Sequence, residues 1–263
     1  MSSDPLKFIR GITFLLLMTW AAFCIALVVF PSALLITVPS RRVIQARRVY
    51  VSYWSGKYLE FAAYLIEVLC GTQVFIHCDD PSILSEGKGV LVLCNHRTRI
   101  DWMFVGWCYG AAIGVVSDML VILKDALRTA PVYGWLMQMG LYIFLERKRE
   151  SDIPHITNML SYHVNIDKPP SLLIFPEGTD LSQSNIAKSN QYATERGLPP
   201  YRYVLHPKPS GMVAALACMR RVEGSVLHDV TIAYDDYQRG VRPNEHGVLL
   251  GEGGERGRGA VWD

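Results

Sequence analysis

The chain has 263 residues, of which half are hydrophobic and only 19% are charged. This composition excludes a disordered chain, and the positive mean hydropathy is unusual for a soluble enzyme. A net charge of +2 argues against a nucleic-acid partner recruited by bulk charge. The six cysteines form no C-x-x-C pair, so we expect reduced, buried thiols on a cytosol-facing protein and no metal site.

The N-terminal region is predicted to be a membrane anchor. Residues 11–38 contain no charged residue, and this run exceeds the roughly 20 residues that span a bilayer. Pro31 predicts a kink, which leaves open a tilted span or a bent insertion into one leaflet. The basic residues that follow place the remaining chain on the cytoplasmic side: Arg41, Arg42, Arg47 and Arg48. Residues 1–48 are therefore interpreted as an anchor with a basic flank.

Apolar residues at helical spacing in 49–72 predict a second helix, which lies at the membrane interface or packs against the protein. From 73 to 250, short apolar runs alternate with helix-like segments near 101–113, 131–139, 151–165, 187–196 and 211–221. The predicted strands are Val74–Cys78, Val90–Cys94, Met119–Leu123, Leu141–Leu145, Leu172–Phe175, Tyr203–Leu205 and Val230–Ala233. This alternation predicts an α/β domain with a mixed, largely parallel sheet flanked by helices. The glycine-rich residues 251–263 are predicted to be a disordered tail.

The first chemical motif follows the strand predicted at Val90–Cys94. His96 and Asp101 are five residues apart, so they face different directions on one helix and meet only where a strand turns into a helix. A histidine held by a carboxylate at such a turn is the arrangement of a general base with its orienting partner. A Cys94–His96 nucleophilic pair is an alternative, although an apolar strand favours an inert thiol.

Two further motifs also follow predicted strands. In Phe175–Asp180, Gly178 permits a tight turn, whose backbone N–H groups and Thr179 hydroxyl suit an anion or an oxyanion. In Phe144–Arg149, the guanidinium of Arg147 suits a phosphate. Each motif by itself is also compatible with an ordinary surface turn.

Four sequence blocks, in this order, resemble those of the glycerolipid acyltransferases over roughly residues 75–235. Asn95–Asp101 resembles the family's N-H-x-x-x-x-D block, Phe144–Arg147 its F-I-x-R block, and Phe175–Thr179 its F-P-E-G-T block. Pro207 stands in the place of the fourth block, and Lys124 matches a lysine that family members carry. Within the family, the wording is most similar to the lysocardiolipin acyltransferase branch.

The resemblance implies an acyl-CoA-dependent acyltransferase acting on a lysophospholipid, with acyl-CoA as co-substrate and no other cofactor. It implies that His96 is the general base and that Asp101 orients it. Glu177, Gly178 and Thr179 would help to bind the acceptor or the transition state. Arg147 would bind phosphate, and Lys124 would belong to the substrate site. The implied location is the endoplasmic reticulum membrane, with the catalytic domain facing the cytosol.

Three departures from the family pattern keep alternatives open. Asp180 stands where many phosphatidic-acid-forming members have arginine, which favours a larger head group. Gly140 is one residue further from Phe144 than is usual. The match fades near Leu250, whereas the lysocardiolipin-like members continue, so the chain resembles a shortened product. The alternatives are an inactive membrane protein that binds partners or competes with a full-length enzyme, and a 1-acylglycerol-3-phosphate acyltransferase.

Overall fold

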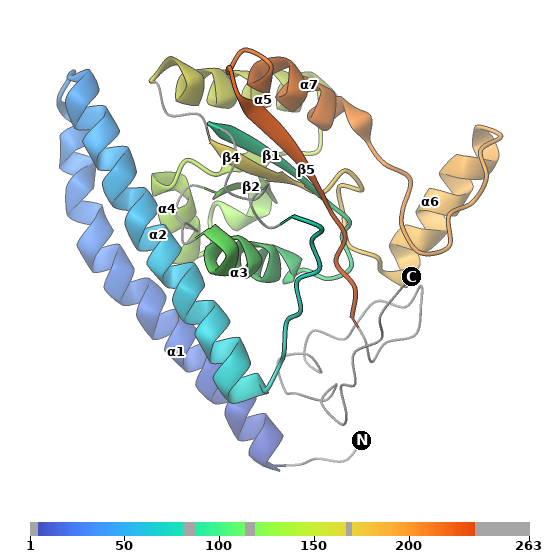
Figure 1. Cartoon of the computed structure of the whole chain (residues 1–263), viewed down its shortest axis with the longest axis horizontal. Coiled ribbons are helices and arrows are strands. Elements are labelled where there is room, and N and C mark those ends of the chain that lie inside the picture. Colours follow the sequence, from blue (N-terminus) through green and yellow to red (C-terminus); the bar gives the residue numbers. More distant parts are fainter. Residues whose placement is uncertain (1–4, 81–87, 114–118, 167–169, 235–263) are drawn as a thin grey trace.

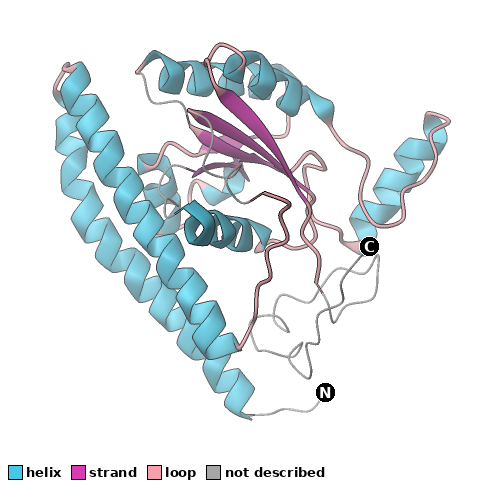
Figure 2. Cartoon of the chain, in the orientation of Figure 1, coloured by secondary structure: helices cyan, strands magenta, loops and turns pink. Residues whose placement is uncertain are grey.

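A computed structural model describes residues 5–80, 88–113, 119–166 and 170–234, and at its centre is a five-stranded sheet (Figures 1 and 2). Its strands are β1 (Gly89–Cys94), β2 (Met119–Lys124), β3 (Ile143–Leu145), β4 (Ser171–Ile174) and β5 (Ser225–Val230). They lie in the order β3-β2-β4-β1-β5, and each neighbouring pair is parallel. The predicted α/β architecture is confirmed, and the described sheet is entirely parallel.

Helices cover both faces of the sheet, and successive residues of each strand point to opposite faces. Leu91 of β1 packs in a cluster with α5 (Arg149–Asn165) and α7 (Pro209–Met219). Its neighbours Val90 and Val92 pack on the opposite side, against α3 (Asp101–Ile113). The short α4 (Tyr133–Met139) and a 3₁₀ turn, η3 (Asp125–Leu127), connect β2 to β3. In Figure 1, α6 (Gln183–Glu195) projects away from the sheet.

The N-terminal helices form a long hairpin that packs on α3 from outside. α1 (Pro5–Val29) ends two residues before Pro31 and continues as a 3₁₀ helix, η1 (Phe30–Thr37), so the helix type changes at the proline, while the predicted kink stays a prediction. α2 (Arg41–Cys70) then returns beside α1 (Figure 1). In the described chain, Phe8–Thr37 is the one helical stretch long and apolar enough to cross a membrane, by length and composition. Its exposed side includes Phe8, Leu16, Trp20 and Leu27, which is consistent with a lipid environment.

The predicted basic flank is not a separate segment, because residues 41–48 form the first turns of α2. A boundary at 48/49 therefore falls inside one continuous helix. Arg41 donates to the carbonyl of Asn165 at 2.7 Å, and the buried Arg48 donates to the carbonyl of Gly140 at 2.9 Å. Both carbonyls lie at helix C-termini, where cations are favoured. These arginines therefore attach the hairpin to the sheet domain.

Three of the predicted strands are wrong. Residues 74–78 form a loop that joins none of the five strands, and the neighbour of β1 on the side away from β4 is β5. Residues 203–205 are also a loop, in which the N–H of Leu205 donates to Glu177 instead of to a strand. The last strand is Ser225–Val230, earlier than the predicted Val230–Ala233. The tail predicted at 251–263 lies outside the described residues, as does the end of the predicted domain from 235 onward.

Candidate active site

Most of the predicted site residues lie along one edge of the sheet. His96 follows β1, Lys124 ends β2, Arg147 follows β3 and Glu177 follows β4. Because all five strands are parallel, their carboxyl ends meet at this edge, where α/β proteins commonly bind ligands.

His96 and Asp101 are in direct contact. Asp101 is the first residue of α3, and its Oδ2 lies 3.0 Å from the Nδ1 of His96. An ionised carboxylate only accepts hydrogen bonds, so this contact places the Nδ1 proton toward Asp101 and leaves Nε2 for a substrate. The imidazole also stacks on Phe175, with ring centroids 4.2 Å apart, and its side chain remains 17% exposed.

The Asp101 carboxylate is fully buried and is fixed by several donors. Its Oδ2 accepts the backbone N–H groups of Arg97, at 2.6 Å, and Thr98, at 2.9 Å. Its Oδ1 accepts the hydroxyls of Thr98, at 2.7 Å, and Tyr234, at 2.6 Å. The carboxylate therefore has a single orientation, which in turn orients the imidazole. An arrangement of this kind can accept a proton from a bound hydroxyl.

Glu177 holds two loops together at the site. Its Oε1 accepts the backbone N–H of His96 at 2.9 Å, and its Oε2 accepts that of Leu205 at 2.8 Å. Burial raises the pKa of the Glu177 carboxyl, and the two backbone donors oppose that shift. In the structure, this carboxylate thus positions His96 and points into the protein, while its predicted contact with the acceptor stays a prediction.

The turn around Gly178 has a left-handed backbone, with φ +70° at that glycine. The N–H of Gly178 donates to the carbonyl of Phe175 at 2.9 Å, so it closes the turn and does not point at a ligand. The hydroxyl of Thr179 donates to Asp180 at 3.3 Å and accepts from Asn185 at 3.0 Å. This turn is therefore built by its own side chains, and a direct role for Thr179 in substrate binding stays a prediction.

The basic side chains lie further along the edge. Arg147 and Lys124 are both exposed, and Arg147 has φ +67°, an uncommon conformation for a residue with a side chain. β3 is three strands from β1, so Arg147 starts about 14 Å from the strand that carries His96. The two residues thus share this edge of the sheet and are separated by the width of about three strands.

Cys94 does not fit the alternative of a nucleophilic pair. The thiol is buried in β1, and burial raises its pKa to about 12. Only the thiolate is a strong nucleophile, so a thiol with this pKa is unreactive at neutral pH. The interpretation of Cys94 as a buried, inert residue is therefore supported.

Two residues that help to build the site, Asn95 and Tyr234, were not predicted from the sequence. The side chain of Asn95 pairs with the backbone of Ile232, accepting its N–H at 2.7 Å and donating to its carbonyl at 3.0 Å. This pairing brings Tyr234, two residues later, to Asp101. The two segments are 137 positions apart, so no local pattern linked them. In the sequence, the one indication of this contact was the asparagine of the N-H-x-x-x-x-D block.

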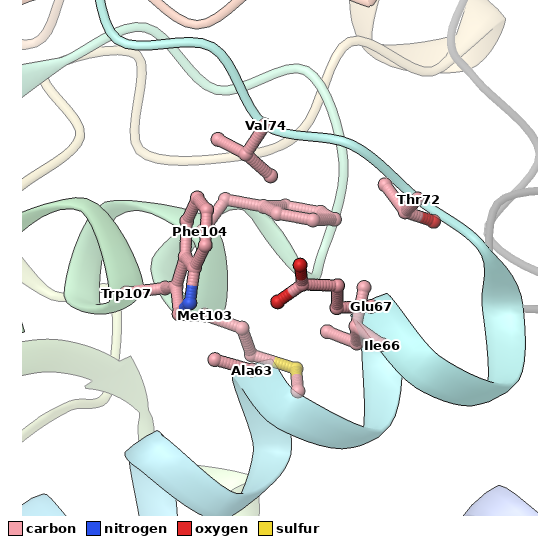
Figure 3. A pocket seen from close by; sticks show the side chains of 8 residues that line it. All are labelled: Ala63, Ile66, Glu67, Thr72, Val74, Met103, Phe104 and Trp107. Carbon is pink, nitrogen blue, oxygen red and sulfur yellow. The ribbon is translucent and has the colours of Figure 1, made fainter. Parts of the chain in front are cut away.

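A separate apolar crevice lies between α2 and α3 (Figure 3). It is lined by Ala63, Ile66, Glu67, Thr72, Val74, Met103, Phe104 and Trp107. Neither His96 nor Asp101 lines it, so this crevice belongs to the packing of the hairpin on the sheet domain.

The structure combines a parallel α/β sheet, a histidine–aspartate pair at its carboxyl edge and an apolar hairpin. These are the features expected of a lipid acyltransferase. The chain belongs to the Acyltransferase family, whose model matches residues 75–234. It is 40% identical over 173 residues to lysocardiolipin acyltransferase 1 of Gallus gallus, covering 65% of this chain and 44% of that protein.

Two other relatives carry different names. Lysophosphatidylinositol acyltransferase 10 of Caenorhabditis elegans is 34% identical, over 70% of this chain and 46% of that protein. Probable 1-acyl-sn-glycerol-3-phosphate acyltransferase 5 of Arabidopsis thaliana is 30% identical, over 93% of this chain and 66% of that protein. The chain spans a little under half the length of the lysocardiolipin relatives it matches. No solved structure matches it significantly.

Proposed function

We propose that this protein transfers an acyl group from acyl-CoA to the free hydroxyl of a lysophospholipid of the lysocardiolipin, lysophosphatidylinositol or lysophosphatidylglycerol type. The observation that carries the proposal is the contact of 3.0 Å between His96 and the buried Asp101. In the described part of the chain, Nε2 of His96 makes no hydrogen bond, so it is available to a hydroxyl at the carboxyl edge.

In the proposed reaction, Nε2 of His96 takes the proton of the acceptor hydroxyl while its oxygen attacks the thioester carbonyl. The C–S bond of the tetrahedral intermediate then breaks and CoA leaves as a thiolate, which takes up the proton held by His96 and returns the imidazole to its neutral form. Because a thiol has a pKa near ~8.5, the thiolate leaves without a strong second acid. Asp101 stabilises the imidazolium that forms on His96. No acyl-enzyme intermediate is involved, in agreement with the unreactive state of Cys94.

The acceptor head group is proposed to lie along the basic part of the carboxyl edge. Arg147 and Lys124 offer exposed cations there. Lys208 offers another, because its side chain lies over the turn at Gly178. A guanidinium can grip a phosphate through two parallel hydrogen bonds. We therefore assign Arg147 to the phosphodiester of the acceptor and the two lysines to further phosphate oxygens of the acceptor or of CoA.

Asp180 favours a phosphodiester acceptor over a phosphomonoester. Its carboxylate lies beside the Gly178 turn and is 3.5 Å from Nε of the exposed Arg99. The negative charge of Asp180 would repel a dianionic phosphomonoester more strongly than a phosphodiester, which carries one charge. Formation of phosphatidic acid, suggested by the name of the Arabidopsis relative, is the second candidate.

The hairpin is proposed to hold this site at a membrane, the cytosolic face of the endoplasmic reticulum. Phe14 and Met18 of α1 belong to one apolar cluster with Phe104, and Tyr234 packs against that cluster. The residue that contacts Asp101 thus also packs against a cluster to which the hairpin contributes side chains. Protease treatment of sealed microsomes should digest a tag placed at the C-terminus, whereas protection of the tag would contradict the cytosolic orientation.

The test of the activity is acyl transfer by the full chain, purified and reconstituted in liposomes. A panel of lysophospholipids and acyl-CoAs, with lysophosphatidic acid included, would be compared with the variant His96→Ala. We expect transfer to at least one phosphodiester acceptor and a loss of at least a hundredfold in the variant. Transfer no greater than that of the variant with any acceptor would reject the proposal, and preference for lysophosphatidic acid would select the second candidate.

A further inference from the structure

Tyr234 reaches the site from the far end of the described chain. It stands four residues after β5, and the pairing of Asn95 with Ile232 holds its segment against the end of β1. Its ring packs edge-on against Phe104 of α3, with centroids 5.9 Å apart. From this position its hydroxyl donates to Oδ1 of Asp101 at 2.6 Å.

The donors to Asp101 divide into two groups by their origin. His96, Arg97 and Thr98 all lie within five residues of Asp101, on the turn that connects β1 to α3. Among the described residues, Tyr234 is the one donor from another part of the chain, 133 positions away. Burial raises the pKa of Tyr234, so its phenol remains neutral and continues to donate at physiological pH.

We propose that Tyr234 is a positioning residue, whose hydroxyl sets the orientation and basicity of Asp101 and through it the state of His96. This inference rests on the proposed function, because it assumes that His96 is the general base. A donor to Oδ1 prevents rotation of the carboxylate, so that Oδ2 stays directed at the imidazole. The same donor draws charge away from the carboxylate and weakens its attraction for an imidazolium.

Removal of the hydroxyl should therefore act in two ways. A carboxylate with one donor fewer attracts a proton on His96 more strongly, so the imidazole pKa rises. It also rotates more freely, so fewer molecules hold the imidazole in the productive direction. Among the described residues, the titratable groups that face this pair are Glu177, which accepts the N–H of His96, and Cys94, whose raised pKa keeps it neutral. Neither changes when the hydroxyl of Tyr234 is removed.

The test compares two tyrosine variants of the full reconstituted chain. Tyr234→Phe keeps the ring on Phe104 and removes only the hydroxyl. Tyr109→Phe is the matched control, because Tyr109 is a buried tyrosine further along α3 and its hydroxyl is 2.6 Å from His228, away from the site. We expect Tyr234→Phe to lower kcat roughly tenfold, the loss typical of one charge-assisted hydrogen bond. In Tyr234→Phe, KM should change little and the acid limb of the pH profile of kcat should move to higher pH. In Tyr109→Phe, neither kcat nor the position of the acid limb should change.

A second measurement separates this inference from the proposed function. The His96 imidazole would be titrated by NMR in labelled protein, with its signal assigned by comparison with His96→Ala. A higher imidazole pKa in Tyr234→Phe than in wild type supports the inference, even in a protein that transfers no acyl group. An imidazole pKa and a kcat both equal to those of wild type, or the same shift in Tyr109→Phe, would overturn it.

Discussion

Asp101→Asn separates the charge of this side chain from its shape. Oδ2 accepts two backbone N–H groups, which cannot turn, whereas Oδ1 accepts the hydroxyls of Thr98 and Tyr234. Hydroxyls can rotate and accept a hydrogen bond instead. Asparagine therefore fits with its oxygen in the place of Oδ2 and its amide NH₂ in the place of Oδ1. We expect the variant to fold.

The chemical loss should be large because the imidazolium of His96 loses its counter-charge. With about 4 Å between the two charges and an effective dielectric constant of about 20, their attraction is about 4 kcal/mol. At 1.36 kcal/mol per factor of ten, this predicts a fall in kcat of about 10³-fold.

The assay is acyl transfer by reconstituted protein, with saturating acyl-CoA and lysophospholipid, together with a thermal melt. We expect a melting temperature close to that of wild type and no further loss when His96→Ala is combined with Asp101→Asn. A fall of less than tenfold in a folded variant would refute the assignment of Asp101 as the partner of a catalytic base.

Three further predictions concern residues that shape the site. Burial raises the pKa of Glu177, so the folded protein keeps that proton to higher pH than the unfolded chain, and the free energy of unfolding falls as pH rises above about 4.3. Glu177→Gln should abolish this pH dependence and lower the free energy of unfolding by about 1–3 kcal/mol, because one backbone N–H is left without an acceptor. Urea unfolding measured across pH tests both effects. A free energy of unfolding that still falls with pH in the variant would contradict the prediction. Gly178→Ala should cost about 1–2 kcal/mol because of the φ of +70°, and an unchanged melting temperature would count against a strained turn. Arg48→Ala should destabilise the protein by about 2 kcal/mol through loss of the bond to Gly140, whereas the exposed control Arg42→Ala should change stability by less than about 0.5 kcal/mol; equal melting temperatures would disprove the attachment.

The sequence blocks of the candidate active site were predictable because each is local. The strand Val90–Cys94, the turn after it and the spacing of His96 and Asp101 predicted that the two side chains could meet, and the structure places them in contact. The parallel sheet then brought the ends of different strands to one edge, as expected from strand–helix alternation. The roles expected for Glu177 and Gly178 were less specific, since the sequence does not show which way a carboxylate or an N–H points.

The misassigned segments share one physical reason. Val74–Cys78 and Tyr203–Leu205 have the composition of short strands, but a strand forms only where the fold places the segment beside another strand, and these two segments join none of the five strands. The basic residues 41–48 also have two possible roles, as a charge signal for membrane orientation or as caps on distant helices. Only the packing of α2 against α4 and α5 reveals the second role.

The sequence by itself determined the apolar N-terminal helix, the parallel α/β domain and the histidine–aspartate pair, because periodicity, hydropathy and short spacing are local properties of the chain. The tertiary structure alone decided which residues complete that pair. Tyr234 and Asn95 act across more than 130 positions, through contacts that exist only once β5 lies beside β1. Whether a buried carboxylate is held in one orientation depends on donors from every segment that surrounds it, and folding brings those segments together.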